Sequence, residues 1–229
     1  MTIGIMQPYF MPYIGYWQLM TTVDKYVVFD DVNYIKRGWS NRNNILLNKE
    51  PYLFSISLNG ASQNKFFNEI DLADDFSKLR KTLYHSYNKA PYYEETVHLL
   101  DEIFEYPDKN LARFIMHSFH VVLKYIDSDT ELIMSSSIEK DNQLKGKDKI
   151  IEICHALHAD RYINAIGGQE LYDSDEFALN GIELRFLLPN RVSYQQYKNE
   201  FVPNLSIIDV LMFNGKEGTK KLLTEYTII

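Results

Sequence analysis

The chain has 229 residues, enough to bury a substantial core, and its 45% hydrophobic and 24% charged content is typical of a globular protein. The net charge of −7 argues against an extended surface for nucleic acid or anionic lipid. Cys154 is the single cysteine, which excludes an internal disulfide and a multi-cysteine zinc site. We find no apolar run of the ~20 residues that span a bilayer and no signal-peptide pattern, so we expect a cytoplasmic protein without a membrane span.

The first 30 residues predict a βαβ unit. A strand at 2–6 leads into a loop with two prolines at 7–12, and a helix at 13–22 connects this loop to a second strand at 25–29. A crossover helix of this kind joins parallel strands, so we expect the two strands to lie side by side in a parallel sheet.

The middle of the chain predicts a hairpin and then a helical insertion. Residues 44–48 and 51–58 are expected to pair as antiparallel strands that turn at Asn48-Lys49. Helical spacing follows over 76–106, with a break near Ala90-Pro91, and over 111–126. Residues 76–126 are therefore a candidate helical lobe.

The rest of the chain returns to alternating elements. We predict strands at 131–134, 161–164 and 183–188, and helices at 147–158, 206–213 and 217–226. The fold class that follows is α/β, with a mostly parallel sheet flanked by helices, a β-hairpin and a helical insertion, all within one domain over 1–229.

Polar residues follow the predicted strands at their carboxyl ends. Gln7, Asp30-Asp31, Ser135 and Asn164 each occupy such a position. Ligands of open parallel sheets bind in the crevice at these ends, so we expect one shared site there.

Three residues are candidates for proton transfer. Asp30 and Asp31 are adjacent, so in an extended segment their side chains point to opposite faces and are poorly placed to act together. One of them could serve as a base or metal ligand while the other caps a turn. His85 lies in an aromatic and polar segment and could accept a proton near neutral pH, or it could interact with a helix C-terminus.

A cationic cluster suggests a ligand that carries a diphosphate. Lys36, Arg37 and Arg42 surround Trp39, a combination that can hold phosphate and stack on a ring. Asn41 adds an amide suited to sugar hydroxyls. Solvated charges around a half-buried tryptophan are the structural alternative. Other candidate substrate-binding residues combine aromatic faces, a cation, an amide and a flexible backbone: Tyr9, Tyr13, Tyr34, Lys89, Asn164 and Gly167.

The chain resembles the WbqC-like protein family over nearly its full length. The resemblance rests on residues 7–16 (QPYFMPYIGY) and 30–43 (DDVNYIKRGWSNRN), and it continues through 87–92 (YNKAPY), Tyr162 with Gly167-Gly168, and 205–209 (LSIID). It implies a place among enzymes that build bacterial surface polysaccharides such as the O-antigen of lipopolysaccharide. It assigns no catalytic residue.

What the resemblance implies is an acyl or aminoacyl (glycyl-type) transferase. Its partners would be a nucleotide-linked amino sugar and the acyl or aminoacyl donor, and we expect no cofactor and no bound metal. Two alternatives stay open. The first is a glycosyltransferase in which Asp30 and Asp31 hold a divalent metal. The second is a noncatalytic module that binds a nucleotide sugar or a protein. The sequence also does not determine whether the protein forms a homo-oligomer.

Overall fold

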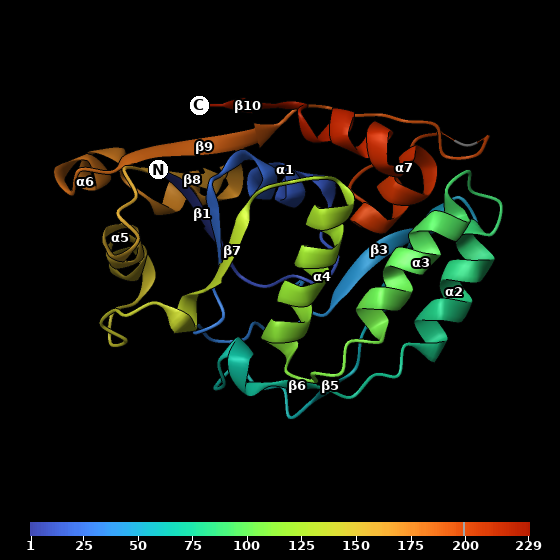
Figure 1. Ribbon diagram of the computed structural model, residues 1–229, viewed down its shortest axis with the longest axis horizontal. Coiled ribbons are helices and arrows are strands. Elements are labelled where there is room, and N and C mark those ends of the chain that lie inside the picture. Colours follow the sequence, from blue (N-terminus) through green and yellow to red (C-terminus); the bar gives the residue numbers. More distant parts are fainter. Residues whose placement is uncertain (199) are drawn as a thin grey trace.

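A central β-sheet organises the molecule (Figure 1). The structure is a computed structural model that describes residues 1–198 and 200–229. Within these residues the sheet has six strands: β1 (Thr2–Met6), β2 (Lys25–Val28), β7 (Glu131–Met134), β8 (Arg161–Ala165), β9 (Glu183–Pro189) and β10 (Tyr226–Ile228).

The strand order is β10-β9-β8-β1-β2-β7, and only β10 runs antiparallel to its neighbour. From β1 the chain adds β2 and then β7 on one side, and it later returns to place β8 and β9 on the other side. The predicted α/β fold with a mostly parallel sheet is therefore confirmed. The direction of winding reverses between β1 and β8, and this reversal marks the crevice in which such sheets bind ligands.

Helices cover both faces of the sheet (Figure 1). The helices α1 (Ile14–Thr22), α4 (Leu111–Tyr125) and α7 (Ile207–Leu223) pack on one face, and α5 (Gly146–Ala156) and α6 (Ser174–Leu179) pack on the other. Neighbouring strand residues alternate between the two cores, as Tyr26 and Val27 do. No helix in the described part of the chain is long and apolar enough to cross a membrane.

The predicted hairpin and the break at Ala90-Pro91 are confirmed. The hairpin consists of β3 (Arg42–Leu47) and β4 (Glu50–Ser55), and the break separates α2 (Ser77–Tyr87) from α3 (Tyr93–Phe104). A small pair, β5 (Leu58–Asn59) with β6 (Asp71–Leu72), lies between them in sequence. Phe76 stacks on Phe104 and Phe114, so α2, α3 and α4 share a core with the sheet.

The C-terminal segment agrees with the prediction in its two helical parts and differs only at its end. The helices predicted at 206–213 and 217–226 are present as the two parts of α7, which a non-helical residue, Gly215, separates. The second part ends at Leu223, and residues 226–228 form β10 against β9. The physical reason is that β9 would otherwise be an open edge, and pairing satisfies its backbone groups.

The kink in α7 depends on the absence of a side chain at Gly215. Its φ is 57°, and a Cβ there would lie 2.5 Å from the ring of Tyr92. We expect Gly215→Ala to lower the free energy of unfolding by about 2 kcal/mol, because both backbone strain and overpacking are introduced. Denaturant unfolding measures this. Gly167→Ala is the matched control, since nothing lies within 4 Å of a Cβ at that position. An equal, small effect of both substitutions would contradict the expectation.

Candidate functional site

The carboxyl ends of β1, β2, β7 and β8 meet at one edge of the sheet, as their parallel pairing requires. Met6 pairs with Val28 across β1 and β2, and Val28 pairs with Met134 across β2 and β7. The chain segments that follow these strands therefore begin side by side.

Gln7 follows β1 and is tied to two tyrosines. The Tyr16 hydroxyl donates to the backbone oxygen of Gln7, and the Tyr9 hydroxyl lies 3.5 Å from Gln7 Oε1. The rings of Tyr9 and Tyr16 stack with centroids 5.6 Å apart. Gln7 and Tyr9 are both partly exposed, so the Gln7 amide is accessible at the sheet edge beside the Tyr9 ring.

Asp30 is fully buried and holds three segments together. Its carboxylate accepts a hydrogen bond from the Ser136 backbone N–H at 2.9 Å and from Asn68 Nδ2 at 3.0 Å. Both oxygens are therefore engaged by the segments after β7 and before β6. This arrangement gives Asp30 an anchoring role at the site.

Asp31 has different partners from Asp30, and the chain bends here, because the Asp30 N–H donates to the Val28 backbone oxygen at 2.9 Å. Its Oδ2 lies 2.9 Å from Lys140 Nζ and 3.0 Å from Lys149 Nζ, and the side chains of all three residues are at least nine-tenths buried. Lys149 also donates to the backbone oxygen of Asp31 at 2.8 Å. We call these three residues the Asp31 cluster.

Charge and burial act in opposite directions on Asp31. Burial alone would raise the pKa of its carboxyl group, but Ser135, Lys140 and Lys149 favour the charged form and hold the pKa below its usual value. Asp31 Oδ1 and the fully buried Ser135 hydroxyl make no well-aligned hydrogen bond with the described residues. Both oxygens are closed off from solvent in this structure, so a ligand donor reaches them only after a local movement of the surrounding segments.

Lys140 and Lys149 were not among the candidate residues predicted from the sequence. Lysine is seldom buried, and Lys149 occupies the first turn of α5, where it looks like a solvated position. The available signal was that Lys149 directly precedes the apolar run Ile150-Ile151, which places it near the buried face of the helix.

The cationic segment after Asp31 lies mostly at the surface. Lys36 and Arg37 are exposed and Trp39 is 46% exposed. The Arg42 guanidinium lies over the Trp39 ring, and it donates to the backbone oxygens of Arg37 and Gly38. Arg42 therefore stabilises this loop, while Lys36 and Arg37 remain open to solvent.

Tyr34 and Asn41 form an internal support of the same loop. The Tyr34 hydroxyl donates to Asn41 Oδ1 at 3.1 Å, and Asn41 Nδ2 donates to the backbone oxygen of Ile56 at 2.8 Å. Tyr34 is only 5% exposed. These contacts show a role in the fold of the loop.

The segment after β8 lies beside the end of β1. Asn164 is buried, and its Oδ1 accepts the Ala165 N–H at 2.8 Å. Its side-chain amide fills the space that a Cβ at Gly168 would need, whereas the space at Gly167 is open. Gly167 thus allows a ligand to approach the backbone near Gln7.

His85 and Lys89 are not brought to this edge. Both line a shallow cleft at the end of α2, together with Leu46, Lys49 and Tyr197. No contact links this cleft to the Asp31 cluster among the described residues, and Tyr13 belongs to another cleft described below.

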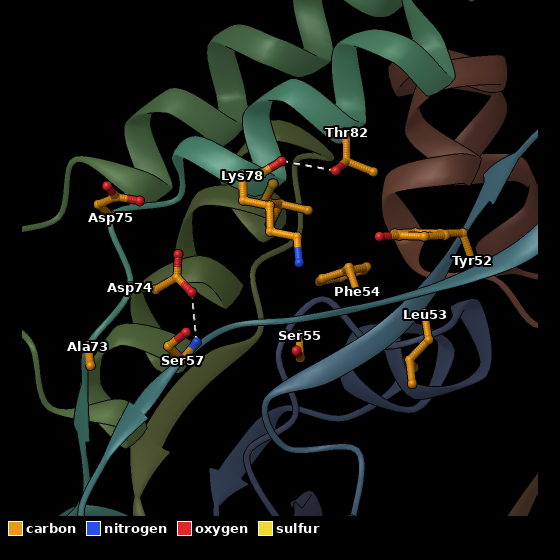
Figure 2. A pocket seen from close by; sticks show the side chains of 11 residues that line it. Tyr52, Leu53, Phe54, Ser55, Ser57, Ala73, Asp74, Asp75, Lys78 and Thr82 are labelled. Carbon is orange, nitrogen blue, oxygen red and sulfur yellow. Dashed lines mark hydrogen bonds between the residues drawn. The ribbon is translucent and has the colours of Figure 1, made fainter.

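A further cleft of about 440 Å³ lies between β4 and the start of α2. Figure 2 shows Lys78 pointing into it toward Phe54, and Asp74 accepting the Ser57 N–H. None of the sequence-predicted site residues lines it. In the described ranges, no three His, Cys, Asp or Glu side chains gather to hold a metal ion.

Comparisons with known proteins agree with this full-length resemblance. The sequence profile of the WbqC-like protein family matches residues 7–221. An uncharacterized protein of Mycobacterium tuberculosis is 25% identical over 224 residues, which cover 94% of this chain and 95% of that protein. No solved structure matches the chain.

Proposed function

The chain belongs to the WbqC-like protein family, and we propose that it is a transferase of bacterial surface polysaccharide biosynthesis. Its reaction would move an acyl or aminoacyl group onto the amine of a nucleotide-linked amino sugar, in the cytoplasm. The observation that carries the proposal is the charged Asp31 carboxylate, held by two buried lysines beside the Ser135 hydroxyl at the carboxyl edge of the sheet.

A carboxylate held in its charged form is suited to receive an amine. Lys140 and Lys149 occupy Oδ2 of Asp31 and fix the orientation of the carboxylate. The acceptor amine would donate to Oδ1 and to the Ser135 oxygen. Gln7 follows β1, the strand next to β2, and the open backbone at Gly167 follows β8, one strand further along the same edge.

The proposed transfer balances without a further reactant. The amine nitrogen attacks the acyl carbon, and a C–N bond forms while the C–O or C–S bond to the leaving group breaks. Asp31 accepts the proton from nitrogen and passes it to the leaving group. A carboxylate of low pKa suffices, because the nitrogen becomes strongly acidic once it is bonded to the acyl carbon.

We propose that the diphosphate of the acceptor lies along Lys36 and Arg37. Both are exposed on the loop that begins at Asp31, and neither is engaged by an ion pair among the described residues. Trp39 and Tyr9 would contact the sugar or base, and Tyr34, Asn41 and Arg42 would hold the loop in place.

Assays of acyl and glycyl transfer onto UDP- and dTDP-linked amino sugars test the reaction. We expect turnover to survive EDTA and to fall by about tenfold in Ser135→Ala, which keeps the ion pairs intact. His85→Asn should retain most of the activity, since His85 lies in another cleft. Loss of turnover with EDTA, restored by magnesium, would replace the proposal with a glycosyltransferase. Tight sugar binding without any turnover would leave a binding module.

Charge reversal tests the diphosphate contact separately. We expect Lys36→Glu to weaken binding of a UDP-linked amino sugar by about 1–2 kcal/mol, measured by calorimetry at low salt. Lys124→Glu on α4 makes the same change of net charge away from the loop and should leave the affinity unchanged. Equal affinities of the Lys36→Glu protein and wild type would reject the contact.

A further inference from the structure

A cleft of about 710 Å³ lies where β9 ends and α1 begins. Pro189 closes β9, and Tyr13 and Ile14 start the helix on the same side of the cleft. The end of β9 is three strands from the end of β2, which places the cleft about 15 Å along the same sheet edge from Asp31.

The walls of this cleft are mainly apolar and well fixed. Tyr194 and Phe201 meet edge to face at 5.0 Å, and the Tyr194 hydroxyl is held by Asp209 at 2.7 Å. The Tyr13 ring packs over Gly15, where a Cβ would lie 2.5 Å from it. Apolar side chains complete the lining: Val192, Pro203, Leu205 and Val210.

The charges around the cleft have one sign. Arg191 is the one charged residue among the described residues that line it, and no carboxylate does so. The start of α1 adds a partial positive charge, because no side chain caps it. The described lining offers an ammonium group no carboxylate as an ion-pair partner, whereas an apolar group next to an anionic one finds both an apolar wall and a cation.

We propose that this cleft binds the donor of the transfer, and that the donor is an apolar acyl group on a phosphate-bearing carrier. The proposal rests on the proposed function, and it decides between the acyl and the aminoacyl donor. The acyl chain lies between Tyr13 and Phe201 with its carbonyl end directed along the edge toward Gln7, and Arg191 contacts the carrier phosphate.

Calorimetry with butanoyl-, hexanoyl- and octanoyl-coenzyme A tests this directly. We expect affinity to rise about two- to fourfold per added methylene group, with coenzyme A alone binding more weakly than any of them. Ser193→Trp places an indole over the cleft from an exposed position and should abolish the dependence on chain length. Ser55→Trp, also exposed but on β4, is the control and should leave the dependence intact.

The outcomes separate the two proposals, because binding is measured without turnover. If binding depends on chain length and only Ser193→Trp removes this dependence, the assignment of the donor to the cleft is supported. This holds even if no amino sugar is acylated, and in that case only the proposed function is rejected. The donor assignment is rejected if the affinity does not change with chain length, if the length dependence is unchanged in Ser193→Trp, or if no acyl-coenzyme A binds. Glycyl transfer observed with such a result would keep the proposed function and exclude the apolar donor. Circular dichroism checks that both tryptophan variants fold.

Discussion

Asp31→Asn is expected to lower the free energy of unfolding by about 3–5 kcal/mol, because it leaves two buried lysines facing a neutral group. Lys140 and Lys149 have side chains no more than 5% exposed, so water cannot replace the lost carboxylate. Adding Lys149→Met should recover part of the loss, since one buried charge is then removed. Denaturant unfolding measures the three proteins, with the exposed Glu139→Gln as the control.

The same cluster predicts a dependence on pH. The pKa of Asp31 is lower in the folded protein than in the unfolded chain, so its contribution is present above the unfolded pKa of about 4 and is lost as the pH falls through the folded value. Relative to Asp31→Asn, the wild-type protein should therefore lose stability below about pH 4. If the difference in the free energy of unfolding between wild type and Asp31→Asn stayed constant from pH 6 to pH 2.5, the assigned ion pairs would be contradicted.

Asp209→Ala is expected to lower the free energy of unfolding by about 3 kcal/mol or more, because it removes a hydrogen-bond acceptor and not an ion-pair partner. Asp209 is fully buried in the first turn of α7 and accepts from Tyr87 at 2.8 Å, Tyr194 at 2.7 Å and Gln196 at 2.7 Å. Removing the carboxylate leaves the buried donors of Tyr87 and Gln196 and the partly buried Tyr194 hydroxyl without their acceptor. Asp209→Asn keeps an acceptor oxygen and should cost about 1 kcal/mol.

The pH response of Asp209 should oppose that of Asp31. Burial raises the pKa of Asp209, and its hydrogen bonds offset this only in part. The contribution of Asp209 to the free energy of unfolding is therefore fully present below the pKa of Asp209 in the unfolded chain. It is lost as the pH rises through the pKa of Asp209 in the folded protein. Relative to Asp209→Asn, the wild type should become less stable as the pH rises from 4 to 7.

A surface aspartate provides the comparison for both cases. Asp127 pairs with Lys216 and Lys220 but is 56% exposed, so Asp127→Asn should cost less than about 1 kcal/mol. If Asp209→Ala and Asp127→Asn unfold at the same denaturant concentration, the buried network around Asp209 does not stabilise the fold.

The local elements and the site edge could be predicted from the sequence. Short apolar runs, the two-proline loop and the helical spacing between them define β1, α1 and β2 within 30 residues, because these patterns are set by neighbours in the chain. Parallel pairing then places Gln7, Asp30 and Asp31 at one edge, where the two carboxylates have different partners.

The partners of those residues were decided by tertiary structure. Lys149 lies 118 positions from Asp31, and Tyr87 lies 122 positions from Asp209, so no local pattern records either contact. The loop around Trp39 shows the same limit, since only the folded chain shows that Arg42 is engaged by backbone oxygens while Lys36 is open. The C-terminal segment has helical spacing, yet residues 226–228 form β10, because hydrogen bonds with the β9 edge outweigh a local preference.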